Sequence, residues 1–128
     1  MKLLLDTHSL MWWFKDDPNL SQRTRSIIAD KRTAVLVSSY SFWEMSIKYR
    51  LGKLDDIGSD MMSEARSSGF VIVDLSESHL RWLEAFEPQP GHKDPFDHII
   101  LAQAVVEDAI LVTSDRRLLA YDVRTLPA

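Results

Sequence analysis

The sequence contains no cysteine, which excludes disulfide bridges and thiolate metal sites. Its four glycines form no glycine-rich phosphate loop, so the dinucleotide-binding and P-loop classes are excluded as well. No apolar run is long enough to span a membrane, and the N-terminal apolar segment is too short for a signal peptide. We therefore expect a cytoplasmic protein without a membrane segment.

Positive charge is also scarce, with 15 Lys and Arg against 19 Asp and Glu and a net charge of −4. This balance gives no general attraction to nucleic acid. It does not exclude a nucleic-acid enzyme, because a cluster of acids that binds divalent cations reverses its own local charge. The 128 residues show no repeat and no internal boundary, so we predict one domain over residues 1–128.

Short apolar runs alternate with helical patterns along the whole chain. Strands are predicted at residues 2–6, 34–37, 70–73, 109–112 and, weakly, 123–126. Helices are predicted to begin near residues 7, 21, 41, 59, 76, 95 and 114. This alternation predicts an α/β three-layer sandwich, with a mostly parallel central sheet of four to five strands flanked by helices.

Asp94 marks a clear helix start. It can be the N-cap, with Pro95 at the first helical position and Asp97 at the third. Asp97 then shares a face with Ile100 and Leu101, which places a carboxylate in line with core residues. Such a charge is costly unless it caps, pairs or binds a cation. For Asp94 itself we favour the cap, with an accessory role beside a metal ligand as the alternative.

Three further acids are predicted near the same edge of the sheet. Asp6 directly follows the first strand, Asp115 follows the fourth, and Glu44 lies in the helix after the second. Sites in parallel sheets form beyond the carboxyl ends of the strands. Asp97 joins the other acids if its helix starts at that edge, which the loop at 87–93 permits. Four clustered carboxylates need cations, and oxygen ligands without cysteine favour Mg²⁺ or Mn²⁺.

Each of these acids also has a purely structural interpretation. Asp6 can simply cap the first helix, and Glu44 can be the capping-box partner of Ser41. Asp97 and Asp115 can be acids that a helix N-terminus favours. A carboxylate that caps a helix can also bind a metal ion. The sequence therefore leaves both the structural and the metal-binding interpretation open for these acids.

Four pieces of the chain resemble the PIN domain family and, within it, the VapC-type toxins of bacterial toxin–antitoxin pairs. Any one piece alone is a weak signal. Together they cover nearly the whole chain, in order and at the family's spacing. The pieces are Leu4-Leu5-Asp6-Thr7, Ser38 with Glu44, Asp94-Pro95-Phe96-Asp97 with Ile100 and Ala102-Gln103-Ala104, and Leu111-Val112-Thr113-Ser114-Asp115.

The resemblance implies a Mg²⁺-dependent endoribonuclease whose acidic quartet is Asp6, Glu44, Asp97 and Asp115. It implies accessory positions at Thr7 and Thr113, which flank such sites. It also implies a structured RNA substrate, a homodimer, and a small VapB- or Phd-like antitoxin that blocks the site. His98 departs from the family pattern, because related sequences often have arginine there, and its role is open.

Five basic residues are candidates for RNA contacts, the alternative being solvated helix faces: Lys48, Arg50, Lys53, Arg116 and Arg117. The four histidines match no common zinc spacing, so we interpret them as surface residues or as neighbours of ligands. The run 11–14 carries more apolar surface than one helix face hides. We expect Trp12 to be exposed and covered by a subunit or an antitoxin; the alternative is that neighbouring helices bury the whole run.

Two other functions remain as alternatives. A metal-dependent DNA nuclease would use the same acids, although 128 residues leave little room for elements that clamp a duplex. A non-catalytic PIN-like RNA-binding or scaffold module would be indicated by loss of one or more of the acids, and all four are present.

Overall fold

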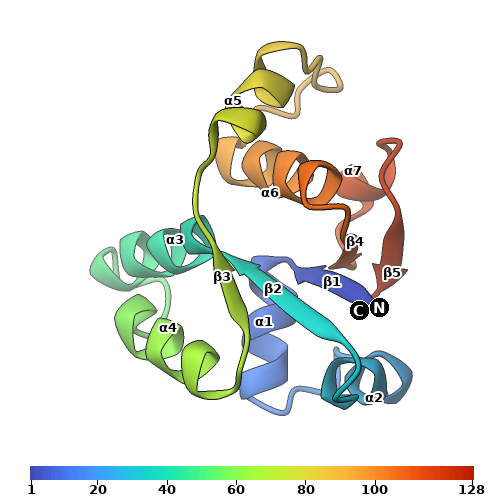
Figure 1. Cartoon of the computed structure of the whole chain (residues 1–128). Coiled ribbons are helices and arrows are strands. Elements are labelled where there is room, and N and C mark those ends of the chain that lie inside the picture. Colours follow the sequence, from blue (N-terminus) through green and yellow to red (C-terminus); the bar gives the residue numbers. More distant parts are fainter.

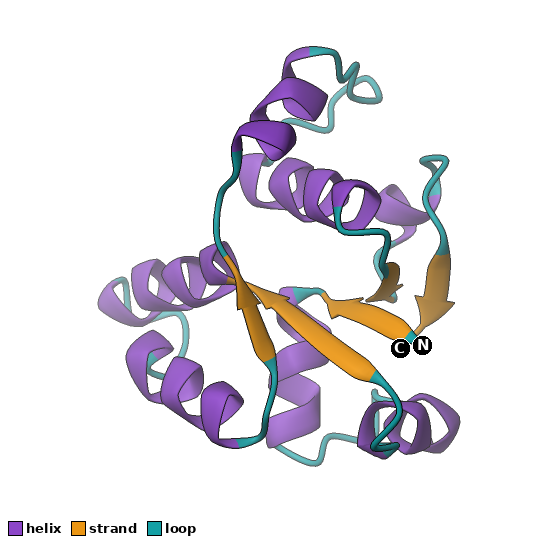
Figure 2. Cartoon of the chain, viewed as in Figure 1, coloured by secondary structure: helices purple, strands orange, loops and turns teal.

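One five-stranded parallel sheet takes its strands from the whole length of the chain (Figures 1 and 2). The computed structural model describes all 128 residues. The strand order is β3-β2-β1-β4-β5, and every neighbouring pair is parallel. The predicted α/β architecture is therefore confirmed, with five strands. They are β1 (Lys2–Leu5), β2 (Ala34–Ser38), β3 (Val71–Val73), β4 (Ile110–Thr113) and β5 (Thr125–Pro127).

Seven helices cover the two faces of this sheet (Figure 1). Four of them pack on one face: α1 (Thr7–Phe14), α2 (Gln22–Ala29), α3 (Ser39–Arg50) and α4 (Gly58–Ser67). The other three contribute to the opposite face: α5 (Glu77–Glu84), α6 (Pro95–Val106) and α7 (Arg116–Leu119). None of the seven is both long and apolar enough to cross a bilayer.

Alternate residues of β1 enter the two halves of the core. Leu3 and Leu5 belong to the apolar cluster under α1 to α4, whereas Leu4 packs with Leu111 and with Leu101 of α6. All five side chains are fully buried. Successive side chains of a strand point to opposite faces, and both faces are covered here, so the strand is apolar without interruption.

The chain reverses its direction of travel through the sheet at β1. It first proceeds to β2 and β3 on one side, then crosses to β4 and β5 on the other. The carboxyl ends of β1 and β4 are therefore a topological switch point, where open α/β sheets bind their ligands. The backbone N–H of Asp6 donates to the carbonyl of Val112 at 3.1 Å, which ties the first residue after β1 to β4.

Two local predictions are wrong. The helix α3 starts at Ser39 and is capped by Ser38, whose hydroxyl accepts from the Tyr40 N–H, because β2 leads into α3 without a loop. Ser41 is buried inside the helix, so Glu44 lies in the second turn and is not a capping-box partner.

Trp12 is not the exposed tryptophan either. The four side chains of 11–14 are all partly buried against the core under α1 to α4, which is closer to the alternative interpretation, although none of the four is fully buried. The tryptophan that solvent reaches is Trp43 of α3, with 57% of its surface exposed.

Candidate functional site

A hollow of about 120 Å³ opens at the switch point, and we call it the acid pocket. Five carboxylates and two permanent cations line it, together with Thr7, His8, Phe96 and Ile100. The structure thus brings all four predicted catalytic acids to one place, from four separate segments of the chain. The carboxylates are Asp6, Glu44, Asp94, Asp97 and Asp115, and the cations are Lys48 and Arg117.

Asp6 is the most deeply buried of these acids, with 7% of its surface exposed. It is the N-cap of α1, and its Oδ1 accepts from the Ser9 N–H at 2.8 Å. The hydroxyl of Ser9 in turn donates to the Val112 carbonyl at 3.1 Å. The predicted cap is therefore present, and it fixes the carboxylate at the pocket. No cationic side chain pairs with Asp6, which leaves its second carboxylate oxygen available to a ligand in the pocket.

Glu44 reaches the acid pocket from α3, where two groups hold its carboxylate. Thr7 donates from Oγ1 to Oε1 at 2.9 Å, and Lys48 Nζ lies 3.2 Å from Oε2, one helical turn further on. The hydroxyls of Thr7 and Ser41 are 3.0 Å apart. Thr7, predicted as an accessory residue, therefore links the start of α1 to Glu44.

Asp97 lies in the first turn of α6 and has two cationic or polar neighbours. Its Oδ2 is 2.9 Å from His92 Nε2 and 3.6 Å from Arg117 Nη2. Burial raises the pKa of Asp97, and so do the charges of Asp94 and Asp115, while the hydrogen bond from His92 opposes them. The ionised form of Asp97 is thus disfavoured in the folded protein. A cation that enters the pocket would stabilise this negative charge.

Asp115 is held by its near neighbour Arg117. Its Oδ1 accepts from the Arg117 N–H at 2.9 Å, and its Oδ2 lies 3.1 Å from Nη2 of the same residue. Burial pushes the pKa of Asp115 upward, but the side-chain and backbone hydrogen bonds from Arg117 together bring it below the usual range. The buried hydroxyl of Thr113 accepts from the Asp115 N–H at 3.0 Å, so Thr113 positions the backbone here.

Asp94 is the N-cap of α6, as predicted, and accepts from the Phe96 N–H at 2.9 Å. It also lines the acid pocket. Among the basic candidates, Lys48 and Arg117 line the pocket as well. Three others are exposed and lie outside its lining, and for these an RNA contact stays a prediction: Arg50, Lys53 and Arg116.

A chain of hydrogen bonds behind Asp97 was not predicted from the sequence. The buried ring of His92 has Nδ1 2.7 Å from the Tyr121 hydroxyl and Nε2 on Asp97. The ionised Asp97 carboxylate only accepts, so Nε2 carries the hydrogen, and in the neutral imidazole Nδ1 then accepts from the Tyr121 hydroxyl, which itself accepts from the Gln89 N–H at 2.9 Å. His98 makes a local contact, donating from Nε2 to the His92 carbonyl at 2.9 Å.

The acid pocket has the ligand chemistry of a hard divalent cation, but its side chains are not preassembled for one. No three histidine, aspartate or glutamate side chains are arranged to hold a metal ion as they stand. In this state Lys48 pairs with Glu44, and Arg117 pairs with Asp115 and lies 3.6 Å from Asp97. Five carboxylates against two cations, with oxygen as the donor atom, nevertheless suit Mg²⁺ or Mn²⁺.

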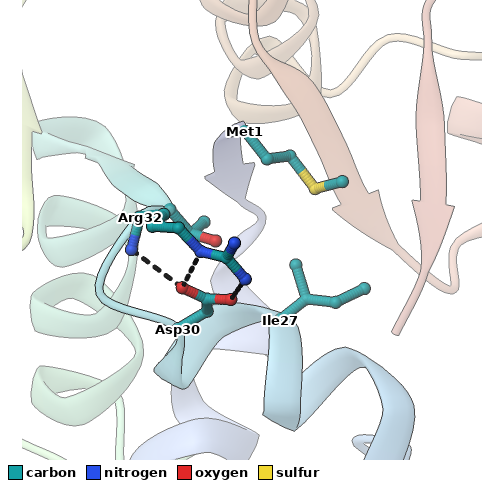
Figure 3. A pocket seen from close by; sticks show the side chains of 5 residues that line it. Met1, Ile27, Asp30 and Arg32 are labelled. Atoms are coloured by element: carbon teal, nitrogen blue, oxygen red, sulfur yellow. Dashed lines mark hydrogen bonds and ion pairs between the residues drawn. The ribbon is translucent and has the colours of Figure 1, made fainter.

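A larger hollow, of about 310 Å³, lies near the N-terminus (Figure 3). Met1 and Ile27 form part of its wall, and Asp30 and Arg32 supply its charge. These two charges satisfy each other, because Arg32 donates from Nε and Nη2 to the Asp30 carboxylate. The side-chain hydrogen bond from Arg32 lowers the pKa of Asp30 to about 2. This hollow therefore offers no candidate catalytic group, and the acid pocket remains the candidate site.

The all-parallel sheet, with a cluster of acids at its switch point, defines the class of this α/β protein. The chain belongs to the PIN domain family, whose profile matches residues 3–124. Its fold is that of VapC-type toxins, as the sequence resemblance predicted. The crystal structure of VapBC2 from Rickettsia felis bound to a promoter DNA fragment is similar, with a TM-score of 0.70 at 16% identity over 99% of this chain and 98% of that one. VapBC-1 from nontypeable Haemophilus influenzae has a TM-score of 0.66 at 18% identity over the same shares.

Two further proteins, one similar in structure and one in sequence, also belong to toxin–antitoxin systems or carry a VapC name. A toxin–antitoxin complex from Klebsiella pneumoniae has a TM-score of 0.65 at 21% identity, over 97% of this chain and 95% of that one. Ribonuclease VapC16 from Mycobacterium tuberculosis is 55% identical over 31 residues, which is 24% of this chain and 22% of that protein. The structural similarities extend over whole chains and concern the fold, whereas the sequence identity is confined to a short segment.

Proposed function

We propose that this protein is a metal-dependent endoribonuclease and the toxin of a type II toxin–antitoxin pair, acting as one PIN-like nuclease domain over residues 1–128. The observation that carries the proposal is the acid pocket, in which carboxylates from four distant segments meet at the switch point of a PIN fold. The short identity to a protein named as a ribonuclease supports the choice of RNA.

The proposed cofactor is Mg²⁺ or Mn²⁺. Asp6, Glu44 and Asp97 would hold the first cation, and Asp115 would help with a second or position the attacking water. When bound, such a cation supplies the positive charge that ionises water and offsets the charge of the phosphate. Among the chain's own groups, Thr7 and Thr113 position Glu44 and Asp115, as their hydrogen bonds indicate.

Lys48 and Arg117 are proposed to exchange partners on loading. In the structure they neutralise acids of the pocket. Once cations take over that role, the two side chains are free to contact the phosphates of the RNA. The reaction is a hydrolysis, in which the water oxygen joins phosphorus, the P–O3′ bond breaks and the 3′-oxygen leaves as a hydroxyl. The products are 5′-phosphate and 3′-hydroxyl ends.

Cleavage assays on the purified protein test this proposal. We expect Asp6→Asn and Asp97→Asn each to abolish cleavage of an RNA oligonucleotide in Mg²⁺, with an unchanged circular dichroism spectrum. Asp122→Asn, at an exposed position outside the acid pocket, is the matched control and should cleave normally. Activity in both pocket variants, or 2′,3′-cyclic phosphate products, would refute the assignment.

The same assay separates the competing functions. Cleavage of a DNA oligonucleotide of the same sequence in preference to RNA would establish a DNA nuclease instead. Calorimetric titration with Mn²⁺ distinguishes a catalytic from a purely binding or scaffold domain, because a scaffold without a metal site should bind none.

We further propose a cytoplasmic homodimer that is silenced by a VapB- or Phd-like antitoxin. The antitoxin partner is supported by three of the similar structures, which are toxin–antitoxin assemblies. If a small protein is encoded immediately upstream, its co-expression with this chain should yield a stable complex without ribonuclease activity. Light scattering on the free protein should give twice the mass of 14.7 kDa, and a monomer would contradict the dimer.

A further inference from the structure

Trp43 stands immediately before Glu44 on α3, and more than half of its surface, 57%, is exposed. The other three tryptophans are partly buried. A large aromatic side chain gains much from burial, so an exposed indole beside the candidate site offers a contact surface to a ligand.

Two other aromatic rings fix Trp43 at the rim of the acid pocket. The centroid of Phe96 is 5.3 Å away with the ring planes at 68°, and that of Tyr40 is 6.0 Å away at 61°. Phe96 lines the acid pocket and directly precedes Asp97. Edge contacts of this kind hold the indole in place while leaving much of it in solvent. The exposed indole is therefore continuous with the pocket through a single side chain.

We propose that Trp43 is the stacking site for an unpaired nucleobase of the RNA substrate, next to the phosphate that enters the acid pocket. This inference rests on the proposed ribonuclease function and adds a substrate requirement to it. An aromatic ring stacks on any base, and the contribution does not depend on base identity. The faces of a base are accessible only when it is not stacked in a duplex, so the nucleotide beside the scissile bond has to be single-stranded.

The charge of the protein supports this assignment. With a net charge of −4 the chain gains no general electrostatic attraction for RNA, so part of its affinity has to come from another source. Stacking supplies it. Lys48 of the same helix lines the pocket, so α3 carries both the exposed indole and a cation at the candidate site. A protein partner at Trp43 is the competing occupant, and the experiment decides between them.

The test compares Trp43→Ala and Trp43→Phe with a matched control, Tyr49→Ala, which removes another exposed aromatic from the same helix. Binding of a fluorescein-labelled, unstructured 12-nucleotide RNA is measured by anisotropy in Mg²⁺ on an Asp115→Asn background. We expect Trp43→Ala to weaken binding roughly 5- to 150-fold, the range for loss of one base–aromatic stack. Trp43→Phe should retain most of the affinity and Tyr49→Ala all of it.

Two further readouts complete the test. RNA should quench tryptophan fluorescence in the parent protein but not in Trp43→Phe, and a fully paired duplex should quench it in neither. Equal affinity of Trp43→Ala and its parent would overturn the inference while leaving the ribonuclease proposal intact, provided that cleavage by wild type is seen. A changed oligomeric mass or lost antitoxin binding in Trp43→Ala, with RNA affinity unchanged, would assign the residue to a protein interface instead. If wild type does not cleave RNA and the Asp115→Asn parent does not bind it, both proposals fail.

Discussion

His92 Nε2 lies 2.9 Å from Asp97 Oδ2, and its other ring nitrogen lies 2.7 Å from the hydroxyl of Tyr121. His92 belongs to the loop before α6, and Tyr121 lies 29 residues away, after α7. The orientation of a proposed metal ligand is therefore set from outside its own helix. Groups that orient ligands in this way commonly change metal affinity when they are removed, although they never touch the metal.

Tyr121→Phe should weaken metal binding. The change removes the hydroxyl that fixes His92 and keeps the ring that packs against Phe86. We expect the Mn²⁺ affinity to fall in calorimetry, by less than the roughly 10- to 100-fold typical of removing a group bonded directly to a ligand, because Tyr121 acts through His92. Tyr49→Phe, at an exposed position on α3, is the control and should bind as wild type does. An unchanged affinity in Tyr121→Phe would mean that His92 does not depend on this hydroxyl.

Asp97→Asn should stabilise the metal-free protein at neutral pH. Burial and the nearby charges of Asp94 and Asp115 raise the pKa of Asp97 above its unfolded value, so the folded state holds this proton more tightly. The ionised carboxylate therefore costs stability, and that cost appears as the pH rises through the folded pKa. Asparagine keeps an acceptor for His92 and removes the charge.

Thermal melting in EDTA checks this prediction. At pH 7 the variant should have the higher Tm, and the difference should shrink as the pH falls toward the ordinary range of a carboxyl, where wild-type Asp97 is protonated as well. Saturating Mg²⁺ should reverse the order, since only wild type gains the binding free energy of the cation. A variant that is less stable in EDTA at pH 7 would contradict this account.

The sequence predicted which acids come together at the site, but not all of the hydrogen bonds and ion pairs that hold them there. Asp6 and Asp115 follow apolar strands that only a covered parallel sheet explains, so topology alone places them together. The Glu44–Lys48 pair could have been predicted from its i, i+4 spacing. The contact between His92 and Tyr121 could not, because no periodicity relates residues of two loops.

The sequence also did not show which tryptophan side chain is exposed to solvent. Trp12 and Trp43 both sit in aromatic helical runs, and which one solvent reaches depends on how α1 and α3 pack against their neighbours. The start of α3 was missed for a related reason. Several serines in succession are each good caps, and only the end of β2 at Ser38 decides among them.

Gly58→Ala should destabilise the fold. A Cβ at this position would lie 2.3 Å from the carbonyl oxygen of Phe42 and equally close to the Ser46 hydroxyl, so α4 would be pushed away from α3. Overpacking of this kind typically costs about 1–3 kcal/mol. Urea denaturation should show it, whereas Ser59→Ala, at the exposed next residue, should change little. Because α3 carries Glu44, the variant should also bind Mn²⁺ more weakly. Equal stability of the two variants would mean that the helices adjust without cost.

Arg117→Gln should change metal and RNA binding in opposite directions. Its guanidinium neutralises Asp115 and approaches Asp97, so a cation entering the acid pocket has to displace it. Removing the charge should tighten Mn²⁺ binding by roughly 2- to 5-fold, a modest effect because the side chain is largely exposed. RNA binding should weaken instead, since one phosphate contact is lost.

Arg116→Gln removes the same charge one residue away and outside the pocket, so it should leave Mn²⁺ binding unchanged. Weaker metal binding in Arg117→Gln would show that the arginine organises the carboxylates and does not compete for them.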